Sequence, residues 1–303
     1  MHSDDNVKED KDSTALASLW DVGANLGHDA FASDARHVMD RASAAGVQCI
    51  ATGTSLAAVQ RIQELGIPFT AGLHPHRAQH LPHEMELASY MTHPQCVAIG
   101  ETGLDYDRMA SPKEEQRKAF AWHIEWAIRT RKPLFLHVRD NVGHNTAFRE
   151  ALAMVGNAQQ KHGSENVRGI VHCFTGTATQ ARAWQSLGLH LGITGWATQD
   201  RGAPLRDVLR SGSIALTHLH IETDAPYLWP ANAPRSAPFS KIRTHRGTMW
   251  RNEPCALPYV LEHVAQTMNV RPNDLRTHLA NNAMRLFQLA PPPSPTPSLP
   301  SMD

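Results

Sequence analysis

The stretch Val97-Ala98-Ile99-Gly100-Glu101-Thr102-Gly103-Leu104-Asp105 decides the fold of this chain. Apolar residues run directly into the carboxylate of Glu101, and a glycine, Gly103, follows shortly after. A short apolar run that ends at a breaker is typical of a buried strand. We therefore predict a strand from Cys96 to Glu101, with Glu101 at the point where the strand reaches the surface. A carboxylate in that place needs a partner, because an unpaired buried charge is costly.

The same pattern recurs in three further segments of the chain. They are Pro133-Leu134-Phe135-Leu136-His137, Gly169-Ile170-Val171-His172 and Leu219-His220-Ile221-Glu222-Thr223-Asp224. Each is an apolar run that ends in a histidine or an acid. The four end residues, Glu101, His137, His172 and Asp224, are the set around which the rest of the chain is organised.

Strand-like runs alternate with helical stripes along the whole sequence. The predicted strands are Leu19–Gly23, Val47–Ala51, Pro68–Leu73, Cys96–Glu101, Pro133–His137, Val167–Cys173, Leu189–Thr194 and Leu219–Glu222. Six helices are predicted with both bounds: Asp34–Ala45, Pro82–Met91, Asn145–Gln160, Leu205–Leu209, Leu257–Met268 and Pro272–Phe287. Three more are predicted from their start signals: a cap at Thr54 or Ser55, the start Ser111-Pro112-Lys113-Glu114, and a capping box of Thr177 and Gln180. Strands and helices that alternate in this way predict an α/β fold, a (β/α)8 TIM barrel. No G-x-G-x-x-G follows the first strand, which counts against the rival doubly wound open sheet.

The composition limits the architecture and the location of the protein. We expect one barrel domain over residues 18–289, between an unstructured segment at 1–17 and a proline-rich unstructured tail at 290–303. No signal peptide and no membrane-spanning apolar run is evident, and the four cysteines form no C-x-x-C pair. We therefore expect a soluble cytoplasmic protein with reduced thiols, no membrane association and no obligate protein partner.

The charge composition gives no overall argument for nucleic-acid binding. Lysine plus arginine and aspartate plus glutamate each number 29, so the formal net charge is zero, although a local basic patch is not excluded. The 19 histidines are the obvious stock of ligands and acid–base groups.

The four strand-end residues indicate a metal site. Active-site residues of a barrel come from the carboxyl ends of several strands, so Glu101, His137, His172 and Asp224 should face one mouth. Two imidazoles and two carboxylates suit a divalent hydrolytic cation: zinc, manganese or magnesium. The neighbouring Cys173 should face the other way, since side chains alternate along a strand. The competing interpretation is that the four are unrelated polar residues at strand ends.

Four blocks of this chain resemble the signatures of the TatD-type metal-dependent deoxyribonucleases: Gly100-Glu101-Thr102-Gly103-Leu104-Asp105, His137-Val138-Arg139-Asp140, His172-Cys173-Phe174-Thr175-Gly176 and Glu222-Thr223-Asp224-Ala225-Pro226-Tyr227. Others that fit are Gly72-Leu73-His74-Pro75-His76, Gly192-Ile193-Thr194-Gly195-Trp196, Arg251-Asn252-Glu253-Pro254 with Leu257-Pro258, and Asn282 to Phe287. The resemblance, which runs from about Asp21 to Phe287, implies a TIM barrel of the amidohydrolase kind. It also implies a divalent metal, magnesium first, at Glu101, His137, His172 and Asp224, and hydrolysis of DNA by a 3′–5′ exonuclease that serves repair or DNA turnover.

The first strand departs from many relatives, which carry H-x-H there as ligands of a first metal. This chain reads Asp21-Val22-Gly23-Ala24-Asn25, a form that resembles the bacterial TatD branch. Gly23 has no side chain to offer, and Asn25 is a neutral oxygen ligand. We expect one firm metal, and a second that arrives with the substrate phosphate.

As a hypothesis for the chemistry, Glu101 and Asp224 are the catalytic carboxylates. Glu101, His137 and His172 hold the metal, and Asp224 orients or deprotonates the attacking water. Asp105 is expected to fix the turn at Gly103. Glu222 should share the face of Asp224, either behind the ligands or in a barrel-interior pair with a basic residue.

Five flanking residues are candidates for contact with the substrate: His74, His76, Arg139, Tyr227 and Arg251. The substrate expected is DNA, as single strands or frayed ends. Plainer interpretations stay open: solvated histidines in a turn, an Arg139 ion pair with Asp140 or Asp105, and an aromatic cap on the barrel core, which we favour for Trp196. The stretch from Ala231 to Arg251 is locally basic and could track phosphates or simply be a solvated loop.

Two other functions remain compatible with the sequence. A barrel hydrolase of another bond (an amide, lactone or phosphate ester) would use the same ligands. A binding protein that has lost a metal is the third hypothesis, and it is weakened by the retention of all four strand-end residues.

Overall fold

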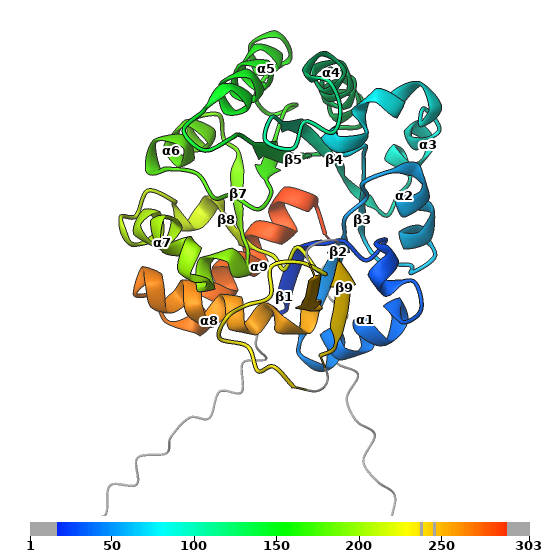
Figure 1. Cartoon of the computed structure of the whole chain (residues 1–303). Helices are drawn as coiled ribbons and strands as arrows, with labels where there is room; N and C mark the ends of the chain where they lie inside the picture. Colours follow the sequence, from blue (N-terminus) through cyan, green and yellow to red (C-terminus); the bar gives the residue numbers. More distant parts are fainter. Residues whose placement is uncertain (1–16, 237–238, 245–246, 290–303) are drawn as a thin grey trace, which may run out of the picture.

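Eight parallel strands follow one another in chain order around a central axis in the computed structural model, which describes residues 17–236, 239–244 and 247–289 (Figure 1). They are β1 (Leu19–Ala24), β2 (Val47–Ala51), β3 (Phe69–Ala71), β4 (Cys96–Asp105), β5 (Leu134–Arg139), β6 (Gly169–Val171), β7 (His190–Ile193) and β8 (Leu219–Ile221). The predicted (β/α)8 barrel is confirmed. The expected unstructured ends, apart from Ala17, lie outside the described residues.

Helices surround the strands, except that the last one, drawn in red, lies inside the ring (Figure 1). They are α1 (Ala35–Ala44), α2 (Leu56–Gln63), α3 (Leu87–Met91), α4 (Lys113–Thr130), α5 (Thr146–His162), α6 (Ala178–Ser186), α7 (Ala203–Arg210), α8 (Leu257–Met268) and α9 (Pro272–Phe287). The capping box of Thr177 and Gln180 opens α6 as predicted. No helix of the described ranges is long and apolar enough to cross a membrane.

Two helix starts differ from the prediction. The segment predicted as a helix from Pro82 to Met91 is instead a 3-10 stretch, Pro75–His83, followed by the short α3. Ser111 does not cap α4: it is fully buried, and its hydroxyl donates to the carbonyl of His76. The Ser111 hydroxyl does not cap α4 because it is bonded to a residue that is distant in the sequence.

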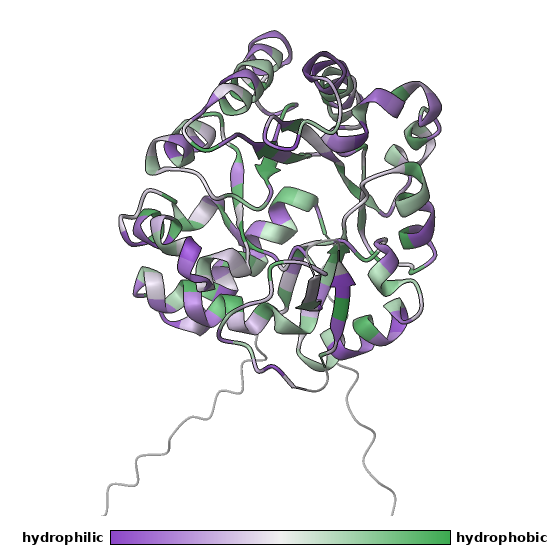
Figure 2. Ribbon diagram, viewed as in Figure 1, coloured by the Kyte–Doolittle hydropathy of each residue, from purple (hydrophilic) through white to green (hydrophobic). Residues whose placement is uncertain are grey.

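Each strand has two apolar faces because both sides of the barrel wall are buried. Outward residues such as Leu134, Leu191 and Ile193 pack on the helices in one large cluster. Inward residues form a second cluster that includes Trp20 and Phe135. Figure 2 shows green, hydrophobic stretches on both strands and helices, with purple, hydrophilic stretches among them.

The last helix, α9, packs against the interior cluster of the barrel. Ala283, Leu286 and Phe287 are at most 4% exposed and belong to the same cluster as the inward residues of the strands. The barrel closes between its first and last strands without a strand ladder among the described residues. Instead the N–H of Asp224 donates to Gly23 O at 2.9 Å, and the N–H of Asn25 donates to Ala225 O at 3.0 Å.

Strand β4 is longer than predicted, because it continues past Glu101 to Asp105. Its pairing with β5 shifts register between Gly100 and Thr102. Gly103 does not break the strand: its φ is +135°, and a Cβ there would collide with the backbone carbonyl of His137. A register shift of this kind re-aims one side chain, here that of Glu101.

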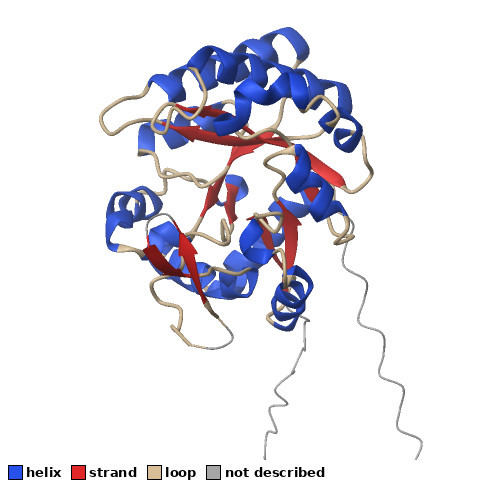
Figure 3. Ribbon diagram, turned by 45° about the vertical axis from the view of Figure 1, so that its right-hand side comes forward, coloured by secondary structure: helices blue, strands red, loops and turns tan. Residues whose placement is uncertain are grey.

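A hairpin that the sequence pattern did not indicate lies in the basic stretch, β9 (Lys241–Thr244) paired antiparallel with β10 (Gly247–Trp250). Figure 3 shows it as a separate pair of red strands outside the barrel wall. Trp250 packs against a small cluster that contains Trp229 and Phe239. The hairpin is thereby fixed to the loop that follows β8.

Candidate metal centre

The structure brings the four strand-end residues together at one mouth of the barrel. His137 Nδ1 lies 3.0 Å from Glu101 Oε1. His172 Nε2 lies 3.9 Å from the same oxygen and 3.6 Å from Asp224 Oδ1. Glu101 and His137 stand within β4 and β5, whereas His172 and Asp224 follow β6 and β8. The alternative of unrelated polar residues at separate strand ends does not fit this geometry.

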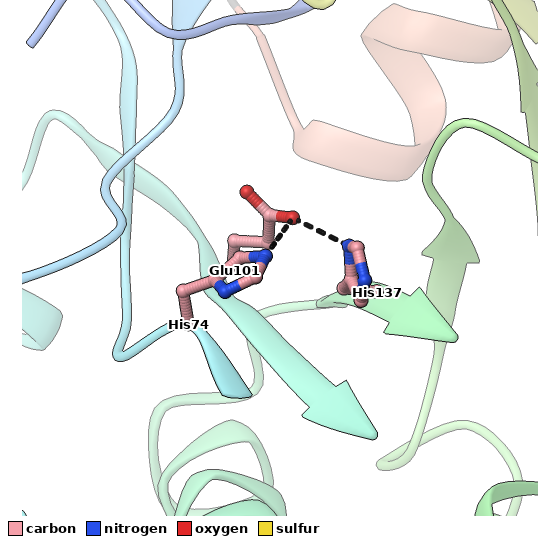
Figure 4. A group of neighbouring side chains, drawn as sticks. All are labelled: His74, Glu101 and His137. Atoms are coloured by element: carbon pink, nitrogen blue, oxygen red, sulfur yellow. Dashed lines mark hydrogen bonds and ion pairs between the residues drawn. The ribbon is translucent and has the colours of Figure 1, made fainter. Parts of the chain in front are cut away.

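His74 completes the most compact part of the site. Its Nε2 lies 3.3 Å from Glu101 Oε1, and Figure 4 shows the carboxylate pointing between the two imidazoles. One ligand atom from each of His74, Glu101 and His137 lies within 4.8 Å of the others. The sequence indicates His74 only as a substrate contact; its position makes it a candidate ligand.

Charge balance at the mouth depends on the histidines. Burial acts to raise the pKa of Glu101, but His74, His172 and a hydrogen bond with His137 outweigh it and hold this pKa well below its usual range. Burial alone would lower the pKa of His137, yet contacts with Asp105 and Glu101 raise it to about 9. Burial lowers the pKa of His74 to about 4 and raises that of Asp224 to about 7. The carboxylates of Asp105 and Glu101 thus favour the protonated form of His137, whereas burial favours the neutral forms of His74 and Asp224.

Asp105 contacts the imidazole rings of two of the histidines. This fully buried carboxylate has Oδ2 at 2.6 Å from His76 Nε2 and 3.2 Å from His137 Nε2. Its Oδ1 accepts from the N–H groups of Asp107 and Arg108 at 3.0 and 2.8 Å. Asp105 therefore fixes the turn after β4 and also orients both rings.

Two of the five proposed substrate contacts lie at the exposed rim. Arg139 is half-exposed and pairs at 2.8 Å with Asp107, a partner different from the Asp140 or Asp105 considered above. Asp140 instead accepts from the N–H groups at the start of α5. Tyr227 is 37% exposed, and its N–H donates to Asp224 O at 2.9 Å. His28, which no sequence signal indicated, lies 2.9 Å from the Tyr227 hydroxyl.

Arg251 takes part in ion pairs within the fold. It is 6% exposed, and its Nη atoms lie 2.7–2.8 Å from Asp34 and 2.7 Å from Glu253. These ion pairs hold the segment after β10 against the start of α1 and leave both Nη groups engaged. Substrate contact through Arg251 stays a prediction, and both Nη groups already have acidic partners within the fold.

Cys173 and Trp196 also have clear positions. Cys173 lies beyond the end of β6 with φ at +48°, so strand alternation does not turn it away from the mouth as expected. Its thiol lies 3.7 Å from the Thr194 hydroxyl, and burial together with Asp224 raises its pKa well above the usual range. Trp196 packs against the main core under Arg201, which agrees with the favoured interpretation as a cap.

Strand β1 ends without a charged ligand at the mouth. Asp21 is fully buried and accepts from the Thr223 N–H at 2.9 Å and from the Thr223 hydroxyl at 2.5 Å, so it closes the barrel seam. Asn25 Oδ1 is buried without a hydrogen-bond partner in the described part of the chain. An orphaned oxygen of this kind is a fitting donor for a cation or an ordered water.

Comparison with known proteins gives the family. The family model described as TatD related DNase matches residues 20–288. The chain belongs to the TatD-related DNase family. TatD-family nucleases are metal-dependent hydrolases of phosphodiester bonds, so the enzyme class expected from the sequence is confirmed.

Relatives of the TatD family cover nearly the whole chain. Proteins named 3′-5′ ssDNA/RNA exonuclease TatD from Pantoea vagans and Cronobacter sakazakii are 36% and 39% identical over 283 and 279 residues. These matches cover 90% and 89% of this chain and 100% and 97% of the relatives. The crystal structure of a TatD family hydrolase from Entamoeba histolytica superimposes with a TM-score of 0.75 at 23% identity, over 90% of this chain and 98% of that one. This last likeness shows the shared fold.

The residues at the mouth fit the divalent metal that the TatD family requires. Imidazole nitrogens and carboxylate oxygens are the donors that divalent hydrolytic cations take in proteins. His74, Glu101 and His137 place such donors close together, with His172 and Asp224 beside them.

Proposed function

We propose that this chain is a metal-dependent 3′–5′ exonuclease acting on single-stranded or frayed ends of DNA. The observation that carries the proposal is the convergence of His74, Glu101, His137, His172 and Asp224 at one mouth of the barrel. Membership of the TatD-related DNase family and the names of its relatives support the choice of substrate.

The proposed ligands are Glu101, His137 and His172, joined by His74 and Asp224. A divalent cation, with magnesium as first choice and manganese or zinc as alternatives, would stabilise charge on the phosphoryl oxygens and lower the pKa of a water molecule. We expect one firm site, and Asn25 is the candidate donor toward a second.

The catalytic roles follow from position. Asp224 lies beside His172 at the rim, so its carboxylate is placed to orient the attacking water and accept its proton. Glu101, shared between His74 and His137, keeps both imidazoles aimed at the mouth.

The rim supplies contacts for the nucleic-acid strand. Arg108 and Arg139 share the single carboxylate of Asp107, at 3.6 and 2.8 Å, which leaves one net positive charge for a phosphate. Tyr227 exposes an aromatic ring next to Asp224, where a splayed base could stack. Stacking of this kind needs an unpaired base and so favours single strands.

A cytoplasmic location and the domain limits of 18–289 stay predictions.

An end-labelled oligonucleotide assay tests the function. A 5′-labelled single strand should shorten stepwise from its 3′ end in Mg²⁺ or Mn²⁺ and remain intact in EDTA. Circular single-stranded DNA and a blunt duplex should be resistant, and a matched RNA strand measures the preference for sugar. Cutting of the circle would contradict exonuclease action, and turnover of a small ester or amide without loss of DNA would favour the other hydrolase hypothesis.

A further inference from the structure

Glu222 lies behind His172, on the side away from the mouth. The side chain is fully buried, and its Oε2 is 2.9 Å from His172 Nδ1, at an angle outside that of a hydrogen bond. The other nitrogen of the ring, Nε2, faces Glu101 and Asp224. His172 is thus held between one carboxylate behind it and two in front.

The Glu222 carboxylate has a fixed place of its own. Its Oε1 accepts from the backbone N–H of Cys173 at 2.5 Å. A Cβ on Gly23 would collide with Oε2, and a Cβ on Gly192 would collide with Oε1. These glycines belong to β1 and β7, the two strands that flank β8.

Backbone conformation does not explain either glycine. Gly23 and Gly192 are absent from the residues with positive φ, so any amino acid could adopt their backbone angles. Space is what distinguishes them: the volume that a side chain would need is filled by Glu222. The absence of a side chain at Gly23 in β1 is therefore linked to the presence of the buried acid that follows β8.

We propose that Glu222 is a positioning residue that orients His172 toward the metal, and that Gly23 and Gly192 are glycine because its carboxylate occupies their side-chain space. The inference rests on the metal-ligand role given to His172 under the proposed function. A carboxylate behind a ligating imidazole fixes the ring and its tautomer and strengthens the free nitrogen as a donor. Loss of such a group weakens metal binding by about 10–100-fold.

The first test is the isosteric substitution Glu222→Gln. Mn²⁺ affinity, measured by calorimetry and by electron paramagnetic resonance of free Mn²⁺, should fall by about 10–100-fold. Far-UV circular dichroism of the metal-free protein should match that of the wild type. Wild-type Mn²⁺ affinity in a folded Glu222→Gln variant would overturn the proposal, since a merely space-filling role would leave metal binding intact.

The second test asks whether a methyl group at position 23 affects metal binding through the Glu222 carboxylate. Gly23→Ala should displace the Glu222 carboxylate and weaken Mn²⁺ binding, whereas in a Glu222→Ala background the same methyl group should have less than about a twofold effect, because coupled residues are not additive. Equal losses in both backgrounds would overturn the link between the two residues. Gly156→Ala, where the nearest atom to a new Cβ is 3.9 Å away, is the matched control and should bind Mn²⁺ like the wild type.

These measurements separate the inference from the proposed function. Metal binding is read without nucleic acid, so a protein that binds Mn²⁺ but leaves DNA intact fails as an exonuclease and still tests Glu222. A wild-type chain without Mn²⁺ affinity would overturn the positioning role together with the metal site. Gly192→Ala displaces the same carboxylate from the other side, and it replaces Gly23→Ala if that variant does not fold.

Discussion

Glu101 is the residue on which the mouth is centred. Its Oε1 is shared by His74 and His137, and the register shift of β4 turns its side chain to the interior of the barrel. The residue is 6% exposed, and its charge is stable only because three imidazoles surround it. The charge of Glu101 therefore depends on the histidines that surround its carboxylate.

Replacement of Asp224 by Asn should remove a proton acceptor while keeping the shape of the side chain. We expect kcat on single-stranded DNA to fall by about 10²–10⁴-fold, the usual contribution of general-base catalysis. Far-UV circular dichroism should not change. The exposed Glu125→Gln on α4 is the control, and full activity of Asp224→Asn would remove the assignment.

A buried histidine away from the mouth should make stability depend on pH. His123 is fully buried; its Nε2 accepts from the Leu73 N–H at 3.0 Å, and burial lowers its pKa to about 4. The folded state therefore binds this proton less readily than the unfolded state, whose histidine titrates near the ordinary value of about 6.5. The contribution of His123 is complete above about pH 6.5 and is lost as the pH falls toward 4.

Urea unfolding at pH 7.5, 6 and 5 tests this dependence. His123→Gln should cost about 1–3 kcal/mol at pH 7.5, because it disturbs a buried hydrogen bond, and this deficit should shrink at pH 5. A deficit that grows toward low pH would reverse the sign we give. The exposed His278→Gln controls for the general effect of losing a histidine.

At the scale of elements, the periodicity of the sequence was enough for the barrel and for most helices. Strand β2 and helices α8 and α9 have the predicted bounds, because a strong apolar stripe or run defines each of them. Prediction failed where a distant partner overrides a local signal. Ser111 bonds to His76 instead of capping α4, and β4 continues through Gly103 because β5 approaches closely there.

The candidate site was foreseeable in part. Glu101, His137, His172 and Asp224 could be found since each ends an apolar run. The closeness of His74 to Glu101 depends on where the loop after β3 passes the shifted strand, and sequence spacing does not encode that. Arg251 looked like a rim cation because its neighbours are basic, whereas its acid partners Asp34 and Glu253 can be recognised only in the fold.

The β9–β10 hairpin should contribute to strand binding rather than to chemistry. Lys241 and Arg243 are exposed on β9, and Asn252, just beyond β10, donates from its N–H to Pro226 O beside Asp224. The double change Lys241→Ala with Arg243→Ala should raise KM and leave kcat near wild type. The slope of log KM against log salt should fall by roughly 0.7 for each phosphate of a single strand that these cations no longer neutralise.

Lys161→Ala, an exposed change near the end of α5, is the control for the hairpin. If the double variant keeps the wild-type KM and salt slope, the basic stretch is a solvated surface, which is the plainer interpretation considered from the sequence.

At the scale of the whole molecule, the metal should link activity to stability. The candidate ligands come from β4, β5 and the loops after β3, β6 and β8, so a bound cation joins separate parts of the barrel. A cation that binds only the folded chain stabilises it by about 2.7 kcal/mol at 100 times its Kd. EDTA should therefore abolish hydrolysis and lower Tm, and added Mn²⁺ should restore both. An unchanged Tm at Mn²⁺ concentrations that restore activity would contradict this linkage.

The position of α9 has a consequence for how the chain is made. All eight strands are synthesised before the helix that covers their interior. A nascent chain that ends ahead of Ala283 therefore leaves the apolar residues around Trp20 and Phe135 exposed to water. Premature termination within this helix would leave an uncovered hydrophobic opening at a nearly finished barrel, a surface that chaperones and proteases recognise.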